Sequence, residues 1–491
     1  MFSRILAALG AVLLLALAAS PAEARWVRAE SKKFIVYSDG DEMLLRKFVS
    51  DLEDYDTILR DQLLVPQDVD TARKLEIYLV GDRDSLKIVW PGIPSSIAGF
   101  YSASMDDIYF IADRPERGDT YSDDIIYHEY AHHFMHHYMK TAYPGWYVEG
   151  FAEYFAPIEM KDTAFMVGGV NQGRADVLLN DRWIPLGDLL SKRPLEFKTG
   201  QEVSAYYAQA WLLTHYMKSD PERRKQLARY FASVRSDKSV VETWTEVTGD
   251  SMEALTAKLK AYTRGNVAGI GFKRIQKRKT AEATVTVLPA SADDFMLLRL
   301  HLARREEEDE PKLLEQIRTK AAKYPGDHMA QVTLAEAELA FGDFAKGRAA
   351  IDGLLTVNPA DAEALRVLGT ALVVKGEEDA ASEEKMLKEA RKILARAYQA
   401  DNDDYRTMFY FTRTQMLSPD YPSENTIEVL LEAETRAPQV GEIRLTLAQA
   451  LMRHKRWDEA VALLTPLAND PHGSGGAQAA QDMLRRIKAN R

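Results

Sequence analysis

Apolar and polar positions alternate with two different periods in the first half of the chain. Segments 34–37 and 75–80 are rich in β-branched and aromatic residues, and a turn-forming Asp-Gly or Gly-Asp pair follows each of them, which is typical of strands. Residues 42–64 between them carry apolar side chains at helical spacing. A further strand is predicted at 107–112, and helices are predicted at 122–139, 150–155, 203–218, 221–235 and 252–263. Early strands followed by helices predict an α+β domain.

The second half of the chain, about 291–488, shows only helical periodicity, and its helical patterns recur in pairs. Pro325 and Pro359 stand 34 residues apart in similar surroundings. The equivalent positions that follow, at spacings of 42, 37 and 33 residues, lie near Asp401, Pro438 and Pro471. One helix pair cannot bury its apolar face alone, so the units are expected to stack into a solenoid.

Two of these units share a longer pattern. Residues 334–344 resemble residues 447–457, and an Ala-rich second helix follows each segment. The pattern resembles the tetratricopeptide repeat, whose period is about 34 residues. About five units are predicted, of which the first (293–324) and the third are degenerate. The resemblance implies a concave surface that binds peptide segments or partner proteins.

The first 24 residues predict a targeting signal. Arg4 precedes an apolar run at 5–19, and the segment closes with small residues at 22–24, which is the plan of a secretory signal peptide with an A-x-A cleavage site. The 15-residue run is shorter than the roughly 20 residues that span a bilayer, and an uncleaved anchor is the alternative. The chain is thus predicted to contain a signal peptide (1–24), an α+β domain (25–264), a linker (265–290) and helical repeats (291–488).

Composition narrows the classes of function. The chain has 491 residues, 63 Lys plus Arg against 74 Asp plus Glu, a net charge of −11 and no Cys. Because nucleic-acid binding needs a basic face, this charge argues against it. The lack of Cys excludes disulfides and thiolate zinc sites, so a metal site has to use His, Asp or Glu. An exported protein without Cys is predicted to be bacterial and periplasmic.

The predicted linker contains a basic run at 273–279. Such a run either docks on anionic lipid or polysaccharide or forms the solvated face of a connector, and we favour the connector.

A metal-binding pattern lies at residues 125–137. His128, Glu129 and His132 form an H-E-x-x-H motif. Residues four apart lie on one face of a helix, so both imidazoles can reach one ion, and Glu129 can act beside it as a general base. Five of the ten histidines fall between 128 and 137, so a helix with surface histidines is the alternative interpretation.

A second candidate segment follows a Pro-Gly break. Residues 146–155 contain Glu149 and Gly150 and overlap the helix predicted at 150–155. Because a catalytic zinc takes three protein ligands and leaves one position open, Glu149 can supply the third ligand beside the two histidines. Gly150 would allow the two helices to approach each other closely.

The combined pattern resembles the gluzincin metallopeptidases, and in particular the bacterial peptidase-MA-like domains that carry W-x-x-E-G-x-A-E-Y and are often joined to tetratricopeptide repeats. The resemblance covers about 34–262 and is densest at 128–155. The residues that match the second motif are Trp146, Glu149, Gly150, Ala152, Glu153 and Tyr154. The resemblance implies a thermolysin-like (gluzincin) α+β fold for the domain that precedes the all-α tetratricopeptide-repeat solenoid.

The same resemblance implies roles for individual residues. His128, His132 and Glu149 would be the ligands of one Zn²⁺ per chain, and Glu129 the general base. Glu153 would orient a ligand histidine through its second nitrogen, as outer carboxylates commonly do; a surface glutamate is the alternative.

The resemblance also implies a group that stabilises the developing oxyanion. The segment 204–211 resembles the Tyr-containing segment of such enzymes, and we choose Tyr207, then Tyr206, then His215. Core aromatic residues on an amphipathic helix are the alternative. The extra histidines His133, His136 and His137 are expected to face solvent or neighbouring helices rather than the metal.

The sequence therefore predicts an exported, periplasmic zinc peptidase whose repeats recruit a peptide or protein substrate or a partner protein. The alternative is a periplasmic scaffold that acts through its repeats and has an inactive or slow peptidase-like domain. Residues 99–105 stand near the place where M1 aminopeptidases carry a G-x-M-E-N segment, and that segment is absent here. Its absence favours an endopeptidase or an unusual exopeptidase. We expect no nucleic-acid partner and no transmembrane segment after signal cleavage.

Overall fold

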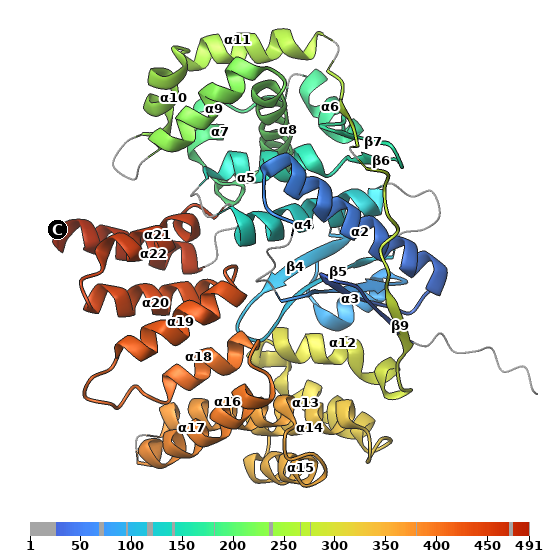
Figure 1. The fold of residues 1–491 in the computed structure, drawn as a ribbon, viewed down its shortest axis with the longest axis vertical. Coiled ribbons are helices and arrows are strands. Elements are labelled where there is room, and N and C mark those ends of the chain that lie inside the picture. The colour runs from blue at the N-terminus through green and yellow to red at the C-terminus, as the bar shows by residue number, and fades with distance from the viewer. Residues whose placement is uncertain are drawn as a thin grey trace, which may run out of the picture.

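The computed structural model describes residues 26–490, except 68–72, 95–96, 115–120, 140–142, 181, 235–238, 266, 275, 380 and 471–474. The predicted signal peptide and the repeat landmark at Pro471 lie outside the described residues. The N-terminal region contains two sheets with helices, whereas the C-terminal region is helical (Figure 1). Within the described ranges, no helix is both long and apolar enough to cross a bilayer.

A mixed six-stranded sheet forms the centre of the N-terminal region. Its spatial order is β4 (Gly99–Ala103), β5 (Ile108–Asp113), β3 (Leu75–Val80), β2 (Phe34–Ser38), β1 (Val27–Glu30) and β9 (Thr284–Val287). β3 pairs parallel with β2 and β5, whereas β1 pairs antiparallel with β2 and β9, and β4 antiparallel with β5. The predicted strands at 34–37, 75–80 and 107–112 are confirmed as β2, β3 and β5.

Three strands of this sheet were not predicted. β1 and β9 have four residues each and β4 has five, so none presents a long alternating pattern. β4 also contains Gly99 and Ser102, and glycine in particular is depleted in strands. These segments become strands because a neighbouring strand is available to pair with them. In β1 and β9, for example, Val27 lies opposite Val287.

Helices α2 (Glu42–Leu63) and α4 (Tyr121–Tyr138) cover one face of the sheet. Alternate residues of a strand point to opposite faces, and Ile77 and Leu79 of β3 belong to the core on this side. α2 confirms the helix predicted at 42–64. α4 confirms the helix predicted at 122–139 to within one residue at each end.

Helices α3 (Arg83–Val89) and α12 (Ser291–Arg304) cover the other face. Tyr78 and Val80 of β3 pack into a core that includes residues of both helices. α12 is the first helix of the segment predicted as separate repeats. The predicted boundary at 290/291 therefore does not separate two cores, because the sheet needs α12 to cover its apolar face.

Seven further α-helices and a small sheet complete the described part of the N-terminal region. The helices are α5 (Gly145–Phe155), α6 (Gln172–Leu179), α7 (Leu186–Ser191), α8 (Gly200–Lys218), α9 (Pro221–Ser233), α10 (Val240–Thr248) and α11 (Met252–Thr263). The small sheet has the order β6 (Glu159–Met160), β7 (Ala164–Val167) and β8 (Ile270–Lys273). α11 has the predicted bounds, whereas α5 begins five residues before the predicted helix.

The segment predicted as a linker, 265–290, crosses the N-terminal region as an extended strap. Its strand β8 pairs with β7, and its strand β9 pairs with β1. Arg274 donates two hydrogen bonds of 2.7 Å to Asp54 of α2, and Arg278 pairs with Asp51 one turn away. The structure thus corrects the interpretation of the basic run as a solvated connector, since two of its arginines pair with an acidic face of α2.

The C-terminal region confirms the predicted helical repeats. Five helix pairs, the first of which begins with α12, and one final helix follow each other along its described residues. They continue with α13 (Glu310–Ala321), α14 (His328–Phe341), α15 (Phe344–Val357), α16 (Ala362–Glu378), α17 (Glu383–Ala400), α18 (Tyr405–Arg413), α19 (Glu424–Arg436), α20 (Gly441–Arg453), α21 (Trp457–Ala468) and α22 (Gly475–Asn490). Figure 1 shows this solenoid curving from α12, beside the sheet, to α20–α22 near the level of α4 and α5.

The aligned prolines of the repeats have a structural explanation. Pro325 and Pro359 stand two residues before Asp327 and Asp361. Each aspartate accepts a hydrogen bond from a backbone N–H three residues later and caps α14 or α16. Each landmark therefore marks the start of the first helix of a pair.

Candidate metal centre

Helix α4 carries the two histidines of the H-E-x-x-H motif on one face. The Nε2 atoms of His128 and His132 are 3.1 Å apart. His132 is buried, whereas the His128 side chain is 16% exposed. Ile126 and Phe134 of the same helix are fully buried in the core, so packing fixes the direction in which the two imidazoles point.

Helix α5 brings Glu149 to the same point. Its Oε2 atom lies 3.5 Å from His128 Nε2 and 3.4 Å from His132 Nε2, and the side chain is fully buried. Ligand atoms of these three residues all lie within 4.8 Å of one another. Across the described ranges, this is the one group of metal-ligating side chains that converges in this way.

The position of α5 depends on helix α8. A Cβ atom on Gly150 would collide with the Thr214 side chain and with the carbonyl oxygen of Ala210, both in α8. Gly150 therefore permits the close approach of α5 to α8. The sequence had instead suggested a close approach of α5 to α4. The glycine of the motif supports the site through the packing behind Glu149.

The triangle of ligand atoms has the size that zinc requires. Its sides are 3.1, 3.4 and 3.5 Å. In a tetrahedral zinc site with bonds of about 2.0–2.1 Å, two ligand atoms are roughly 3.3 Å apart. Two imidazoles and one carboxylate are also a donor set that catalytic zinc sites use, with a fourth position left for water or substrate. The residues present therefore fit a zinc ion.

Glu153 lies on the other side of the His128 ring. Its Oε1 atom is 3.6 Å from His128 Nδ1, while Nε2 faces Glu149. Burial disfavours the charged imidazole, but the hydrogen bond to Glu149 and the charges of Glu153 and Glu129 together raise the pKa of His128 above its ordinary value. The structure thus places Glu153 where it can orient the ring through its second nitrogen.

Arg174 is a site residue that sequence reasoning missed. From α6, its Nε and Nη2 atoms donate hydrogen bonds of 2.9 and 2.6 Å to the two carboxylate oxygens of Glu153. Its guanidinium carbon also lies 5.0 Å from the ring centre of Tyr207. Burial opposes the charge of Arg174, but the Glu153 carboxylate raises the pKa of its guanidinium. The cap residue Asn171 starts this helix, yet nothing in the local sequence indicates that α6 reaches the metal centre.

Tyr207 of α8 faces the metal centre. Its ring centre is 6.4 Å from that of His128. Burial and the charges of Glu149, Glu153 and Glu129 raise its pKa well above the ordinary value. The phenol therefore keeps its proton at neutral pH and can donate a hydrogen bond. The charge of the half-buried Glu129 contributes to the raised pKa values of both Tyr207 and His128.

The two other candidates on α8 are placed elsewhere. Tyr206 is fully buried, and its ring packs against Phe197 with centres 5.6 Å apart. His215 has its Nδ1 atom 2.9 Å from the Tyr262 hydroxyl and its Nε2 atom 3.2 Å from the Ala268 carbonyl oxygen. His215 thus holds α8 against α11 and the strap, away from the triad.

Two of the extra histidines are buried beside the site rather than exposed. His133 and His137 stack with ring centres 4.9 Å apart. His133 Nδ1 lies 3.0 Å from the hydroxyl of Tyr101 in β4. Burial lowers the pKa of His133 to about 4, so its ring is neutral at pH 7 and can accept this hydrogen bond. These histidines join α4 to its neighbours.

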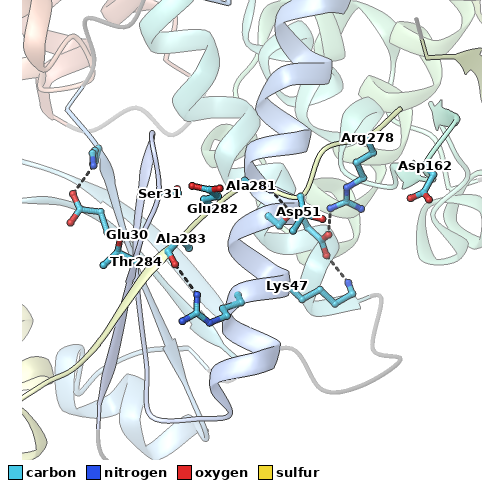
Figure 2. A pocket seen from close by; sticks show the side chains of 14 residues that line it. Glu30, Ser31, Lys47, Asp51, Asp162, Arg278, Ala281, Glu282, Ala283 and Thr284 are labelled. Carbon is cyan, nitrogen blue, oxygen red and sulfur yellow. Dashed lines mark hydrogen bonds and ion pairs between the residues drawn. The ribbon is translucent and has the colours of Figure 1, made fainter. Parts of the chain in front are cut away.

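A cavity of about 930 Å³ lies where the strap crosses α2 and β1, and no residue of the triad lines it. Figure 2 shows Lys47 and Arg278 directed at Asp51 in this cavity. Arg46 donates a 2.8 Å hydrogen bond to the carbonyl oxygen of Ala283. The charged groups that line the cavity are largely paired with each other. We therefore assign the cavity to the attachment of the strap and not to the metal centre.

A comparison with protein families finds one match. A family described as "Protein of unknown function (DUF1570)" matches residues 124–242, about a quarter of the chain. The matched segment contains the triad, Glu129, Glu153, Arg174 and Tyr207. No curated protein matches the chain significantly.

Among the solved structures, the chain is similar to a thermophilic TPR protein of Thermus thermophilus. The two are 19% identical, and the match covers 41% of this chain and 98% of that chain with a TM-score of 0.32.

Proposed function

We propose that this protein is an exported zinc peptidase of the gluzincin type, with a thermolysin-like arrangement of its N-terminal region. The observation that carries the proposal is the triangle of His128, His132 and Glu149, whose sides of 3.1, 3.4 and 3.5 Å suit one zinc ion. Glu129, which is next to His128 in the sequence and half-buried, is the proposed general base.

Zinc bound at this triangle would supply a Lewis acid toward a peptide carbonyl. Glu129 takes the proton of the attacking water and later passes it to the leaving amine. Tyr207 keeps its proton because burial and three nearby carboxylates raise its pKa. Its hydroxyl then donates a hydrogen bond to the oxyanion that develops on the carbonyl oxygen.

The charge of the site supports a divalent cation. Glu129, Glu149 and Glu153 bring three carboxylates to the site, where their charges raise the pKa of Tyr207, and Arg174 brings one guanidinium beside Glu153. Uncompensated carboxylates are costly to bury, and a divalent cation would balance this charge.

The C-terminal helical repeats indicate a role in protein interaction, and we propose that they recruit a peptide or protein substrate or a partner protein. Their extent, eleven described helices from α12 to α22, favours a second candidate function. In that case the protein is a periplasmic scaffold that acts through its repeats, and its peptidase-like region is inactive or slow.

Metal analysis separates these functions first. We expect about one zinc per chain in purified protein spanning residues 25–491, and none in a His128→Ala/His132→Ala variant. A matched control, His328→Ala/His454→Ala, removes two histidines of the solenoid and should keep the zinc. If the wild-type chain takes up no zinc even after reconstitution, the scaffold function is favoured.

Hydrolysis of unfolded β-casein then tests the chemistry. Glu129→Gln should keep its zinc and lose activity about 10²- to 10⁴-fold, as expected for loss of a general base. The exposed Glu159→Gln is the matched control and should retain the wild-type rate. Equal rates for Glu129→Gln and wild type would falsify the proposed role of Glu129.

A further inference from the structure

Strand β4 is the free edge of the six-stranded sheet nearest the metal centre. It pairs with β5 on one side and has no strand partner on the other among the residues that the structure describes. Tyr101 in its middle contacts His133, the residue after the ligand His132. The charge of Glu129 also acts on Tyr101. β4 therefore runs beside the part of α4 that carries the two histidines of the motif.

Helix α4 contacts β4 from one side, and one of the contacts is polar. The Tyr101 hydroxyl lies 3.0 Å from His133 Nδ1, and the two rings meet edge to face with centres 5.8 Å apart. His133 is itself fixed between Tyr130 and His137, whose rings stack on it. The hydrogen bond between half-buried Tyr101 and buried His133 thus joins β4 to the helix that carries the two ligand histidines.

The solenoid holds β4 from the other side, at the hairpin that leads to β5. The Tyr405 hydroxyl donates a 3.0 Å hydrogen bond to the carbonyl oxygen of Ser104, and Arg406 Nη1 donates one of 2.8 Å to that of Asp106. The side chain between them, Met105, is buried in the core of the last repeats with Tyr405 and the following helices.

The solenoid residues that make these contacts are fixed in turn. Arg406 Nε lies 3.0 Å from Asp404 Oδ1, and Arg366 Nε of α16 lies 3.4 Å from Asp404 Oδ2. Further along the solenoid, the Gln439 side chain interacts with that of Tyr101. Contacts from the start of α18 and from Gln439 thus reach β4 and the hairpin that follows it.

We infer that the solenoid is part of the substrate site, because it clamps the edge strand on which an extended peptide would pair. Tyr101 is the positioning residue at which β4, α4 and the solenoid meet. The ligand class is an unfolded polypeptide, whose backbone would continue the sheet at β4. The inference that substrate pairs with β4 rests on the proposed function. The clamp, by which we mean the contacts that hold β4 between α4 and the solenoid, does not rest on it. The repeats then act on the site directly, besides any recruitment of partners.

The test loosens each side of the clamp and measures β4 directly. Tyr101→Phe keeps the ring and removes the hydrogen bond to His133, and Arg406→Ala removes the bond to the hairpin. Matched controls are Tyr324→Phe and Arg318→Ala, since these residues bond to Asp294 and Glu338 near the start of the solenoid, in helices before the one that contacts the hairpin. Two variants on different elements keep the test valid if one fails to fold.

Hydrogen exchange of the β4 amides, compared with those of β3, reports the clamp without any need for activity. We expect exchange of β4 to rise roughly 3- to 10-fold in Tyr101→Phe and about 10-fold in Arg406→Ala, as for the loss of one hydrogen bond. With β-casein as the probe, KM should rise by a similar factor while kcat stays within about twofold and zinc content is unchanged.

The possible outcomes separate the clamp from the proposed function. Equal β4 exchange in the clamp variants and in the controls overturns the clamp, whatever the activity. Raised exchange with unchanged KM in an active enzyme overturns β4 as the strand that receives substrate. If the wild type binds no zinc and cleaves nothing, the proposed function fails alone, and raised exchange still supports the clamp.

Discussion

The metal centre and the middle of the solenoid bury opposite kinds of surface. At the metal centre, His132, Glu149 and Glu153 are 4%, 0% and 6% exposed. In the solenoid, α16 and α17 meet at Gly369 and Leu394, where a Cβ on the glycine would lie 2.6 Å from a Leu394 methyl group. The metal centre buries titratable groups against each other, whereas the contact between α16 and α17 buries apolar side chains in close packing.

This difference separates residues that serve function from residues that serve stability. Buried carboxylates lower the stability of a fold unless their charge is compensated, so the proposed metal ion would account for their presence around the triad. A buried leucine contributes about 1.5–3 kcal/mol to folding. We therefore expect substitutions in the solenoid to change stability, and substitutions at the metal centre to change activity in a protein that still folds.

Leu394→Ala should give the largest effect and probes the solenoid side of the comparison. Because Leu394 is fully buried against Gly369, the variant should lose about 2–5 kcal/mol of unfolding free energy. Urea unfolding followed by circular dichroism measures this, and zinc content at low urea should be unchanged. The exposed Leu417→Ala is the control and should stay within about 0.5 kcal/mol of wild type. Loss of zinc from folded Leu394→Ala would show that the two regions are not separable.

Tyr207→Phe probes the metal-centre side with the smallest change in shape. If its hydroxyl stabilises the oxyanion, kcat on β-casein should fall about 10²- to 10³-fold. Its unfolding free energy should stay within about 1 kcal/mol of wild type. Tyr206→Phe is the neighbouring control, since Tyr206 packs against Phe197; its kcat should not change. Equal losses in both variants would assign the effect to the packing of α8.

Arg174→Gln should give the smallest of the three effects. The variant shortens the side chain and removes the charge that holds Glu153, so kcat/KM should fall roughly 10- to 100-fold, as for other groups that support a metal ligand. Steady-state kinetics at saturating zinc measure it. The exposed Arg182→Gln is the control and should behave as wild type. An unchanged kcat/KM would mean that Glu153 keeps His128 in place without Arg174.

Local patterns predicted the elements whose contacts lie close together in sequence. The 42–64 periodicity became α2, and the prolines at 325 and 359 marked helix starts. The motif spacing placed His128 and His132 on one face of α4, where the structure also brings Glu149. Each prediction used an interval shorter than one helix pair, over which the helical period alone decides which residues lie side by side.

Contacts between distant segments escaped prediction for the opposite reason. Arg278 pairs with Asp51 across 227 positions, and Tyr405 bonds to the Ser104 carbonyl across 301. A solvated linker and a separate solenoid were therefore expected where the structure has a paired strap and a helix, α12, that covers the sheet. Short strands such as β4 were missed because their partners, not their composition, make them strands.

By itself, the sequence determined the helical repeats, three central strands, α2 and a pair of imidazoles one helical turn apart. The tertiary structure decided that Gly150 packs on α8, that Tyr207 rather than Tyr206 faces the ligands, and that Arg174 holds Glu153. The physical reason is the separation in sequence between the residues that interact. Periodicity sets which face of an element a residue occupies, whereas the choice of neighbour depends on how apolar faces and buried charges from distant segments are satisfied together.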